Sequence, residues 1–91
     1  MALALLTTTA FEKDLRRAEK QGKDRDKLEA IVNLLQAQED LPARCRAHRL
    51  HGDWSGHWDC HVGPDWVLLY RVTSEELILI RTGSHSELFG R

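Results

Sequence analysis

Residues 66–72, Trp66-Val67-Leu68-Leu69-Tyr70-Arg71-Val72, predict a largely buried β-strand. Aromatic, β-branched and leucine side chains fill the run, and a short apolar segment between turn signals favours a strand over a helix. Gly63-Pro64-Asp65 precedes the run and residues 73–76 follow it, so a turn is expected at each end. A buried strand needs partners, which the flanking sequence supplies.

The segments on either side of this strand predict two neighbours in an antiparallel sheet. Residues 57–62 alternate as a strand does, with His57, Asp59 and His61 on one face and Trp58, Cys60 and Val62 on the other. Residues 77–82 (LILIRT) predict the next strand, and Gly83 ends it. Residues 84–89 are expected to form a short helical or irregular tail.

The start of the chain predicts a strand and then a helix. Residues 3–9 are apolar and then rich in threonine, which suits a first strand. Thr9 and Glu12 match the capping box that opens a helix, and Gly22 is a typical helix stop. The apolar stripe of this helix consists of Phe11, Leu15 and Ala18.

A second helix is predicted from Asp26, with Glu29 three residues later and Pro42 beyond its end. Its apolar stripe consists of Leu28, Ile31, Leu34 and Leu35. The short polar link between the helices predicts an antiparallel helical hairpin. The element order is therefore β-α-α-β-β-β, an α+β fold with the hairpin packed on one face of an antiparallel sheet.

Length and composition limit the number of domains and the classes of protein that this chain can belong to. The 91 residues predict a single domain over residues 1–91. Because 13 Lys+Arg oppose 14 Asp+Glu, bulk charge does not indicate nucleic-acid binding, although Arg44, Arg46 and Arg49 can make a local basic patch. Two cysteines argue against a disulfide scaffold and favour the cytoplasm. The apolar start is too short for a signal peptide or a membrane span.

The second half of the chain holds all five histidines, and residues 61–66 tie a histidine, a carboxylate and an aromatic ring to one turn. Histidine gives or takes a proton near neutral pH. Imidazoles, a carboxylate, a guanidinium and aromatic rings together are the groups needed to cleave RNA without a metal or another cofactor. The candidates that a sheet can bring together are His48, His61, Asp65, Trp66, Arg81, His85 and Phe89.

Structural roles compete with each of these candidates. Trp66 suits the core as well as base stacking, Asp65 suits the turn, and Arg81 suits a surface ion pair. Phe89 can pack the tail on the sheet, and His51 and His57 are expected to be solvated. A zinc site at His48-x-x-His51 or His57-x-x-x-His61 is a rival, but the i, i+4 spacing suits a helix rather than a strand.

The ordered combination of residues from His48 to Gly90 resembles the YafQ-type toxins of the RelE/ParE superfamily. The motifs are His48-x-Leu50-x-Gly52-x-Trp54-x-Gly56, then Asp59-x-His61-Val62-x-Pro64-Asp65-Trp66-x-Leu68-x-Tyr70, then Arg81-Thr82-Gly83-x-His85-x-x-Leu88-Phe89-Gly90. Residues 24–35 are also compatible with the family. The resemblance implies a RelE-like fold, in which a curved antiparallel sheet carries two N-terminal helices.

The resemblance also implies an activity and partners. Such proteins are toxins of type II toxin–antitoxin systems, and they are metal-independent endoribonucleases that cut mRNA in the ribosomal A site. The implied partners are the ribosome, mRNA and a DinJ-like antitoxin, typically a ribbon-helix-helix protein through which the complex reaches operator DNA. No membrane and no cofactor are implied.

The family's site residues carry over by position. His48, His61, Asp65 and His85 match catalytic positions. Trp66, Arg81 and Phe89 match substrate-binding or supporting positions. The roles expected are His85 as general acid, Asp65 with His61 on the base side, and His48 with Arg81 steadying phosphate charge.

Two residues depart from the family's pattern, and two other functions compete. Trp58 stands where the family commonly has Arg, and Arg49 where it commonly has Pro. The alternatives are an inactive toxin-fold module that only binds an antitoxin and a gyrase inhibitor of the ParE branch. The complete histidine–aspartate set favours the endoribonuclease, since function lies in the site and not in the fold.

Overall fold

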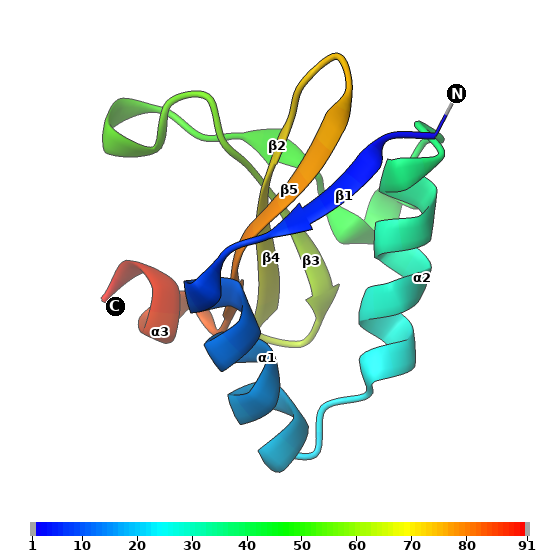
Figure 1. The fold of residues 1–91 in the computed structure, drawn as a ribbon. Helices are drawn as coiled ribbons and strands as arrows, with labels where there is room; N and C mark the ends of the chain where they lie inside the picture. The colour runs from blue at the N-terminus through cyan, green and yellow to red at the C-terminus, as the bar shows by residue number, and fades with distance from the viewer. Residues whose placement is uncertain (1, 91) are drawn as a thin grey trace.

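The structure is a computed structural model and describes residues 2–90 as a five-stranded sheet with three α-helices (Figure 1). The elements are β1 (Ala4–Thr7), α1 (Thr9–Lys20), α2 (Arg25–Gln36), β2 (His48–Arg49), β3 (Trp58–Gly63), β4 (Trp66–Val72), β5 (Glu76–Gly83) and α3 (His85–Phe89). Two 3-10 turns, η1 (Ala43–Cys45) and η2 (Gly52–Trp54), flank β2. The predicted α+β class is confirmed. No helix among the described residues is both long and apolar enough to span a membrane.

The sheet has the strand order β1-β5-β4-β3-β2, with β4 in the centre as its apolar sequence predicts. β4 pairs antiparallel with β3 and β5, but β1 pairs parallel with β5, so the sheet is mixed rather than wholly antiparallel. The chain between these two strands contains α1, α2 and the other three strands, which is long enough for a parallel pairing. β2 was not predicted, because two residues give no periodicity.

Both predicted helices form and run antiparallel, but α1 is capped one residue and α2 two residues earlier than predicted (Figure 1). The cap of α1 is Thr8, whose hydroxyl oxygen accepts from the Phe11 N–H at 2.9 Å and donates to the Ile80 carbonyl at 2.7 Å. The cap of α2 is Asp24, which accepts from the Asp26 N–H at 2.9 Å. Several adjacent residues could serve as caps, and backbone geometry selects among them.

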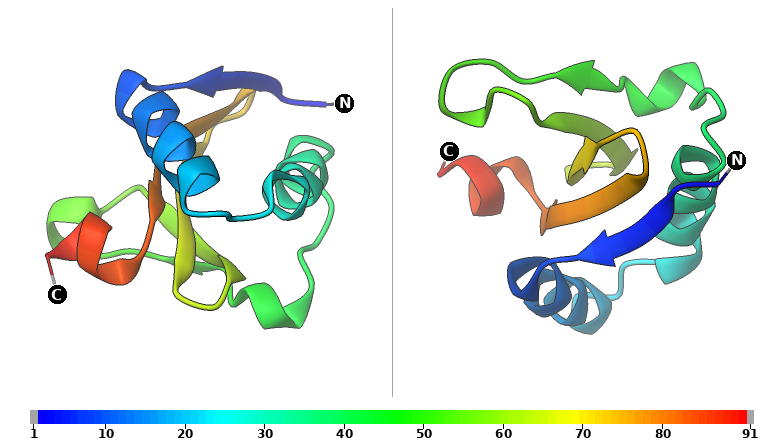
Figure 2. Two further views of the ribbon diagram at one scale, coloured as in Figure 1. Left: turned by 90° about the horizontal axis from the view of Figure 1, so that it is seen from below. Right: turned by 45° about the horizontal axis from the view of Figure 1, so that its top comes forward.

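The core lies between the sheet and the helices α1 and α2, and we call this side of the sheet the helix face. Its buried members include Phe11, Leu15, Leu28, Ile31, Cys60, Trp66, Leu68, Tyr70, Leu77 and Leu79. Figure 2 shows α2 and α3 on opposite sides of the central strands. We call the side with α3 the site face, because strand alternation turns Asp59 and His61 toward it.

Candidate active site

The turn between β3 and β4 is joined to the start of α3 through Asp65. Asp65 has a left-handed backbone, with φ of 47°, in which aspartate is better tolerated than most residues. Its Oδ1 lies 3.2 Å from the His85 backbone N–H, which donates to it, and 3.2 Å from His85 Nδ1. These bonds from the His85 backbone and then its ring hold the pKa of Asp65 below its ordinary value.

His85 is presented at the first position of a short capped helix. Ser84 accepts from the Glu87 N–H at 3.0 Å, and Glu87 accepts from the Ser84 N–H at 2.8 Å, which completes a capping box. Glu87 also pairs with Arg17 of α1 at 3.1 Å. The helix that carries His85 is therefore tied to α1 as well as to the turn at Asp65.

His61 and His85 face each other across the site. His61 lies on β3 opposite Val67 of β4, and its ring centroid is 5.4 Å from that of His85. Both rings keep access to solvent. The predicted convergence of these two histidines with Asp65 is what the structure has, but Asp65 contacts His85 rather than His61.

His48 is held by a carbonyl and a carboxylate. Its Nδ1 lies 2.9 Å from the Arg46 carbonyl oxygen and 3.1 Å from Asp59 Oδ1. This Oδ1 has no hydrogen-bond partner within residues 2–90, so its contact with His48 is electrostatic. An Nδ1 beside two acceptors carries the proton, which leaves Nε2 free to face a substrate.

Asp59 is a site residue that sequence reasoning did not select. Its side chain is 6% exposed, and burial raises its pKa above the ordinary value, while His48, His61 and His85 in that order oppose the rise. A buried carboxylate among three imidazoles is a mark of a functional site. The available signal was the alternation that set Asp59 on the face of His61.

Arg81 stands at the same register as Asp59, two strands away across Leu69, with its charge already partnered. Its guanidinium binds both carboxylate oxygens of Asp14 on α1, with Nη2 at 3.0 Å from Oδ1. Asp14 is 4% exposed and also accepts from the Thr82 N–H at 3.2 Å and from Arg17 at 3.0 Å. The bond to Asp14 raises the pKa of Arg81. Arg81 remains 31% exposed, so part of it can still meet a phosphate.

Trp66 lies in the core and not on the site face, so of the two roles predicted for it the supporting one fits this structure. The residue is 4% exposed, belongs to the core of the helix face and donates from Nε1 to Thr82 Oγ1 at 2.9 Å. Thr82 in turn donates to the Val67 carbonyl at 2.9 Å. Trp66 therefore locks β4 to β5 beneath the site, which is the structural alternative considered for it.

Phe89 lies half-buried with other rings around a shallow hollow. Its ring centroid is 6.2 Å from that of His85 and 6.1 Å from that of Trp54, which meets it edge-on. We call this the aromatic hollow; it has a volume of about 520 Å³ and is lined by Leu50, His51, Trp54, Asp59, His85, Leu88 and Phe89. Trp54 was not selected from the sequence, although it stands in the motif around Gly52.

The two histidines expected to be bystanders lie close to this hollow. His51 is one of its walls. His57 packs edge-on to Trp54 at 5.4 Å between centroids, and its Nδ1 is buried with no hydrogen-bond partner in the described part of the chain. His57 is thus a support for Trp54 rather than a solvated residue.

No metal-binding cluster is evident among residues 2–90, where no three His, Cys, Asp or Glu side chains are grouped as ligands. Cys45 and Cys60 are free and buried. Burial, then the nearby Cys45 and Asp59, raises the pKa of Cys60 to about 12, so its thiol is a poor nucleophile. The ionisable groups described above for the site face are imidazoles, carboxylates and the Arg81 guanidinium.

The two departures from the family's pattern contact each other. Arg49 and Trp58 pair across β2 and β3, and the Arg49 guanidinium carbon lies 5.4 Å from the centroid of the Trp58 ring. Trp58 packs against the core of the helix face, so this stacked pair lies on the side of the sheet away from His48 and Asp59. Neither residue lines the aromatic hollow.

Comparison with known proteins agrees with this geometry. Residues 3–90 match the family described as bacterial toxin of type II toxin-antitoxin system, YafQ. The mRNA interferase toxin YafQ of Escherichia coli K12 is 43% identical over 81 residues, covering 88% of each chain. Among solved structures, the E. coli DinJ-YafQ toxin-antitoxin complex matches with a TM-score of 0.90 and 38% identity, covering 99% of this chain and 100% of the matched one.

A metal-bound toxin from Helicobacter pylori has the same fold, with a TM-score of 0.89 and 37% identity over 96% of this chain and 99% of that one. Sequence, fold and relatives therefore agree on a single assignment. The chain belongs to the YafQ family of bacterial toxins of type II toxin–antitoxin systems.

Proposed function

We propose that this toxin is an mRNA interferase, an endoribonuclease that cleaves mRNA on the ribosome by metal-independent acid–base chemistry. The observation that carries the proposal is the pair of imidazoles, His61 and His85, whose ring centroids lie 5.4 Å apart on the exposed site face. Two such groups on either side of a phosphate can remove one proton and supply another. The fold and family alone would not distinguish an active toxin from an inactive one.

In this mechanism His61 takes the proton of the ribose 2′-OH, and the 2′-oxygen attacks the adjacent phosphorus. His85 then gives its proton to the 5′-oxygen as the P–O bond to that oxygen breaks. The products are a 2′,3′-cyclic phosphate and a 5′-hydroxyl end. Asp65, expected from sequence to assist the base, instead orients His85, because its Oδ1 holds both the backbone and the ring of that residue.

Charge on the phosphorane is steadied by two further groups. His48 offers Nε2, since its Nδ1 is engaged by the Arg46 carbonyl with the buried Asp59 beside it. Arg81 offers the part of its guanidinium that Asp14 leaves exposed. Fixed cations and donors of this kind stabilise charge that develops in the transition state without reorganisation. Phe89 and Trp54 provide ring surfaces for a base next to the cleaved bond.

The proposed partners follow from the activity and from the relatives. The ribosome would supply mRNA in its A site, and the toxin would act in the cytoplasm, where translation occurs. A DinJ-like antitoxin would bind the toxin and link it to operator DNA, as the DinJ-YafQ complex suggests. The single domain spanning residues 1–91 would carry the whole activity.

Primer extension on mRNA after induction of the toxin tests the proposal. We expect new 5′ ends with the native chain and none with His85→Ala, since loss of the acid costs roughly 10²–10⁴-fold. A native toxin that halts translation without cutting would instead support the inactive or gyrase-directed alternatives. Circular dichroism of the variant controls for folding.

Chelation tests the metal-independent step. Because His61 and His85 account for both proton transfers, we expect cleavage by ribosome-bound toxin to be unchanged by EDTA at a concentration that leaves the magnesium needed by ribosomes. Zinc- and copper-selective chelators test the same point more strictly, because they leave magnesium in place. Loss of cleavage with either, restored by one added metal, would replace this mechanism by a metal-assisted one.

A further inference from the structure

The turn η1 presents two arginines beside the catalytic histidines. Cys45 is 1% exposed and anchors the turn in the core, so its neighbours Arg44 and Arg46 project outward and are exposed. Arg46 has a left-handed backbone, with φ of 47°, which ends the turn. The sequence Arg44-Cys45-Arg46 thus fixes two guanidinium groups on one rigid turn.

These arginines form one wall of a hollow next to His61, which we call the basic hollow. It has a volume of about 300 Å³ and is lined by Arg44, Arg46, His61, Val62, Gly63 and Pro64. No carboxylate of the described residues lines it. Its ionisable groups are two guanidinium groups and an imidazole, which favours an anionic ligand.

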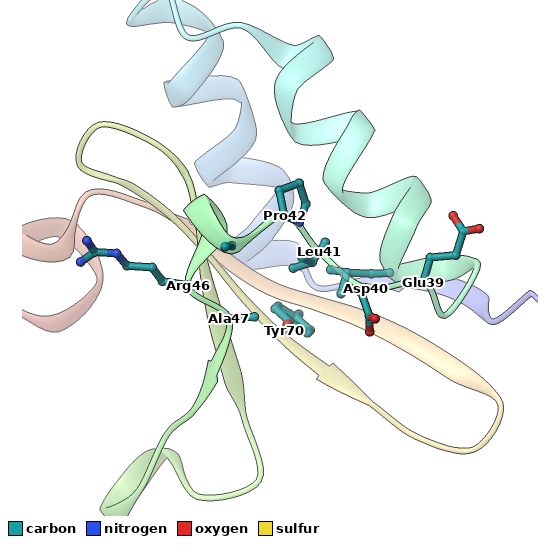
Figure 3. Close-up of a pocket in the computed structure, with 9 residues that line it drawn as sticks. Glu39, Asp40, Leu41, Pro42, Arg46, Ala47 and Tyr70 are labelled. Atoms are coloured by element: carbon teal, nitrogen blue, oxygen red, sulfur yellow. The ribbon is translucent and has the colours of Figure 1, made fainter.

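Neither arginine is neutralised within the described residues 2–90, where no ion pair involves Arg44 or Arg46. Glu39 and Asp40 line a second hollow, to which Arg46 and Tyr70 also contribute. Figure 3 shows the Arg46 side chain extending away from both acidic residues. Arginine is suited to phosphate because its planar fork donates two parallel hydrogen bonds.

The basic hollow is continuous with the catalytic groups. His61 belongs to its wall, and the carbonyl of Arg46 holds His48. On the other side of the His61–His85 pair lies the aromatic hollow, to which His85 contributes. Along β3 the order is therefore the aromatic hollow at Asp59, the His61–His85 pair, and the basic hollow at Val62 and Gly63.

We propose that the basic hollow binds a phosphodiester of the mRNA strand adjacent to the cleaved one, on the His61 side. The strand would place a base in the aromatic hollow, its scissile phosphate between the two imidazoles, and the next phosphate against Arg44 and Arg46. This assignment rests on the proposed endoribonuclease function and extends it to substrate positioning. Arg49 is excluded from the subsite because it is stacked on Trp58 at the helix face.

The test measures binding without cleavage, so that it is independent of catalysis. A fluorescently labelled, fully 2′-O-methyl RNA strand lacks the attacking hydroxyl, and its affinity is measured by anisotropy from 50 to 200 mM salt. Removing one cation that neutralises a phosphate of a single strand lowers the salt slope by roughly 0.7, which is about fivefold in affinity at 0.1 M salt. We expect this decrease for Arg44→Gln and for Arg46→Gln, and about twice the change in slope for the double variant.

Two exposed arginines provide matched controls. Arg49→Gln removes a cation that is close to the subsite in sequence. Arg71→Gln removes a cation near the far end of β4; at the rise per residue of a β-strand, it lies about 16 Å from Trp66, where β4 begins. Both controls should keep the native slope. Circular dichroism should show all variants folded, since each side chain is exposed.

The outcomes separate the proposal from its alternatives. A double variant that matches Arg71→Gln in affinity and salt slope overturns the subsite. Normal binding of the strand together with weaker binding to ribosomes that lack mRNA would assign the arginines to ribosomal RNA and also overturn it. Native RNA that binds as expected but is not cut on the ribosome would count against the endoribonuclease, not against the phosphate subsite.

Discussion

Asp59 shows at the scale of one residue how the site competes with stability. A buried carboxylate loses hydration, and its Oδ1 receives no hydrogen bond in return from residues 2–90. It lies 3.1 Å from His48 Nδ1 and so presents its charge to the site. The residue is therefore better explained by the charge it provides to the site than by any contribution to folding.

Asp59→Asn should keep or raise the free energy of unfolding while lowering cleavage by about 10²-fold through the misplaced His48. Burial raises the pKa of Asp59 above its ordinary 3.8, so the folded state holds this proton longer than the unfolded state. Native stability should consequently fall, relative to the Asn variant, as pH rises from about 4 through the folded pKa. Urea unfolding of both proteins across this range measures the difference. A variant less stable than the native chain at pH 7 would contradict this account.

Asp65 carries a charge and has a left-handed backbone. A variant that tests the charge must therefore keep a residue that tolerates this backbone. Asp65→Ala adds strain of roughly 1 kcal/mol, whereas Asn tolerates this conformation, so Asn is the cleaner substitution. We expect Asp65→Asn to fold normally and to lower cleavage about tenfold or more. The pH–rate profiles of the native toxin and of Asp65→Asn, measured side by side, test which proton transfer this carboxylate serves.

The acid limb of the same profile should not move in Asp65→Asn. The pKa of Asp65 is lowered by its bonds from His85, so the carboxylate stays ionised until the pH falls below its ordinary range. The acid limb therefore does not report the ionisation of Asp65. A profile in which the acid limb moves and the alkaline limb stays would return Asp65 to the base side.

At the scale of elements, α1 holds both the end of β5 and the helix α3. Asp14 receives Arg81 and the Thr82 N–H, while Arg17 bridges Asp14 to Glu87. The helix that starts the fold thus fixes the position of the helix that carries His85. Gly83 lies beneath this junction, where an added Cβ would be 2.9 Å from Glu87 Oε1.

Asp14→Asn should weaken this junction by about 2 kcal/mol, because it leaves the Arg81 guanidinium without its counter-charge. The figure is below that for a fully buried pair, since Arg81 is 31% exposed and water screens it. Glu29→Gln is the matched control, because the Arg25–Glu29 pair is more than half exposed on each side and should be worth at most about 0.5 kcal/mol. Urea unfolding gives both values, and equal effects would show that the buried cluster has no special role.

Sequence patterns predicted the elements more reliably than their ends and partners. The periods of β3, β4 and β5 and the stripes of both helices identified the elements, because burial on one face leaves a local signal. The caps were misplaced by one or two residues, and β2 left no pattern at all. The parallel pairing of β1 with β5 joins segments about 70 residues apart and has no local signal.

In the molecule as a whole, one face of the sheet packs the core and the other carries the candidate site. The helix face holds the core, including Trp66, and the site face holds the imidazoles. Residue types and order predicted His48, His61, Asp65, Arg81, His85 and Phe89 near one another. They could not predict that Asp14 binds Arg81, that Asp59 lies beside His48, or that Asp65 contacts His85 rather than His61. The place of Trp54 beside Phe89 was also not predictable, since each of these contacts depends on which strands and helices meet.

Because the site lies on one face of the sheet, an antitoxin that covers this face should both stabilise the toxin and exclude RNA. A 91-residue chain buries only roughly 60–65% of its unfolded surface, so a partner that binds only the folded toxin has a large effect on its stability. At a free antitoxin concentration of 100 Kd, the gain is about 2.7 kcal/mol. If the antitoxin also covers the site face, it should displace the 2′-O-methyl RNA strand in proportion to its occupancy. His85→Ala should be stabilised equally, which urea unfolding with and without antitoxin can check. Stabilisation without displacement would mean that the antitoxin binds elsewhere, and that inhibition requires a change of shape rather than a covered site.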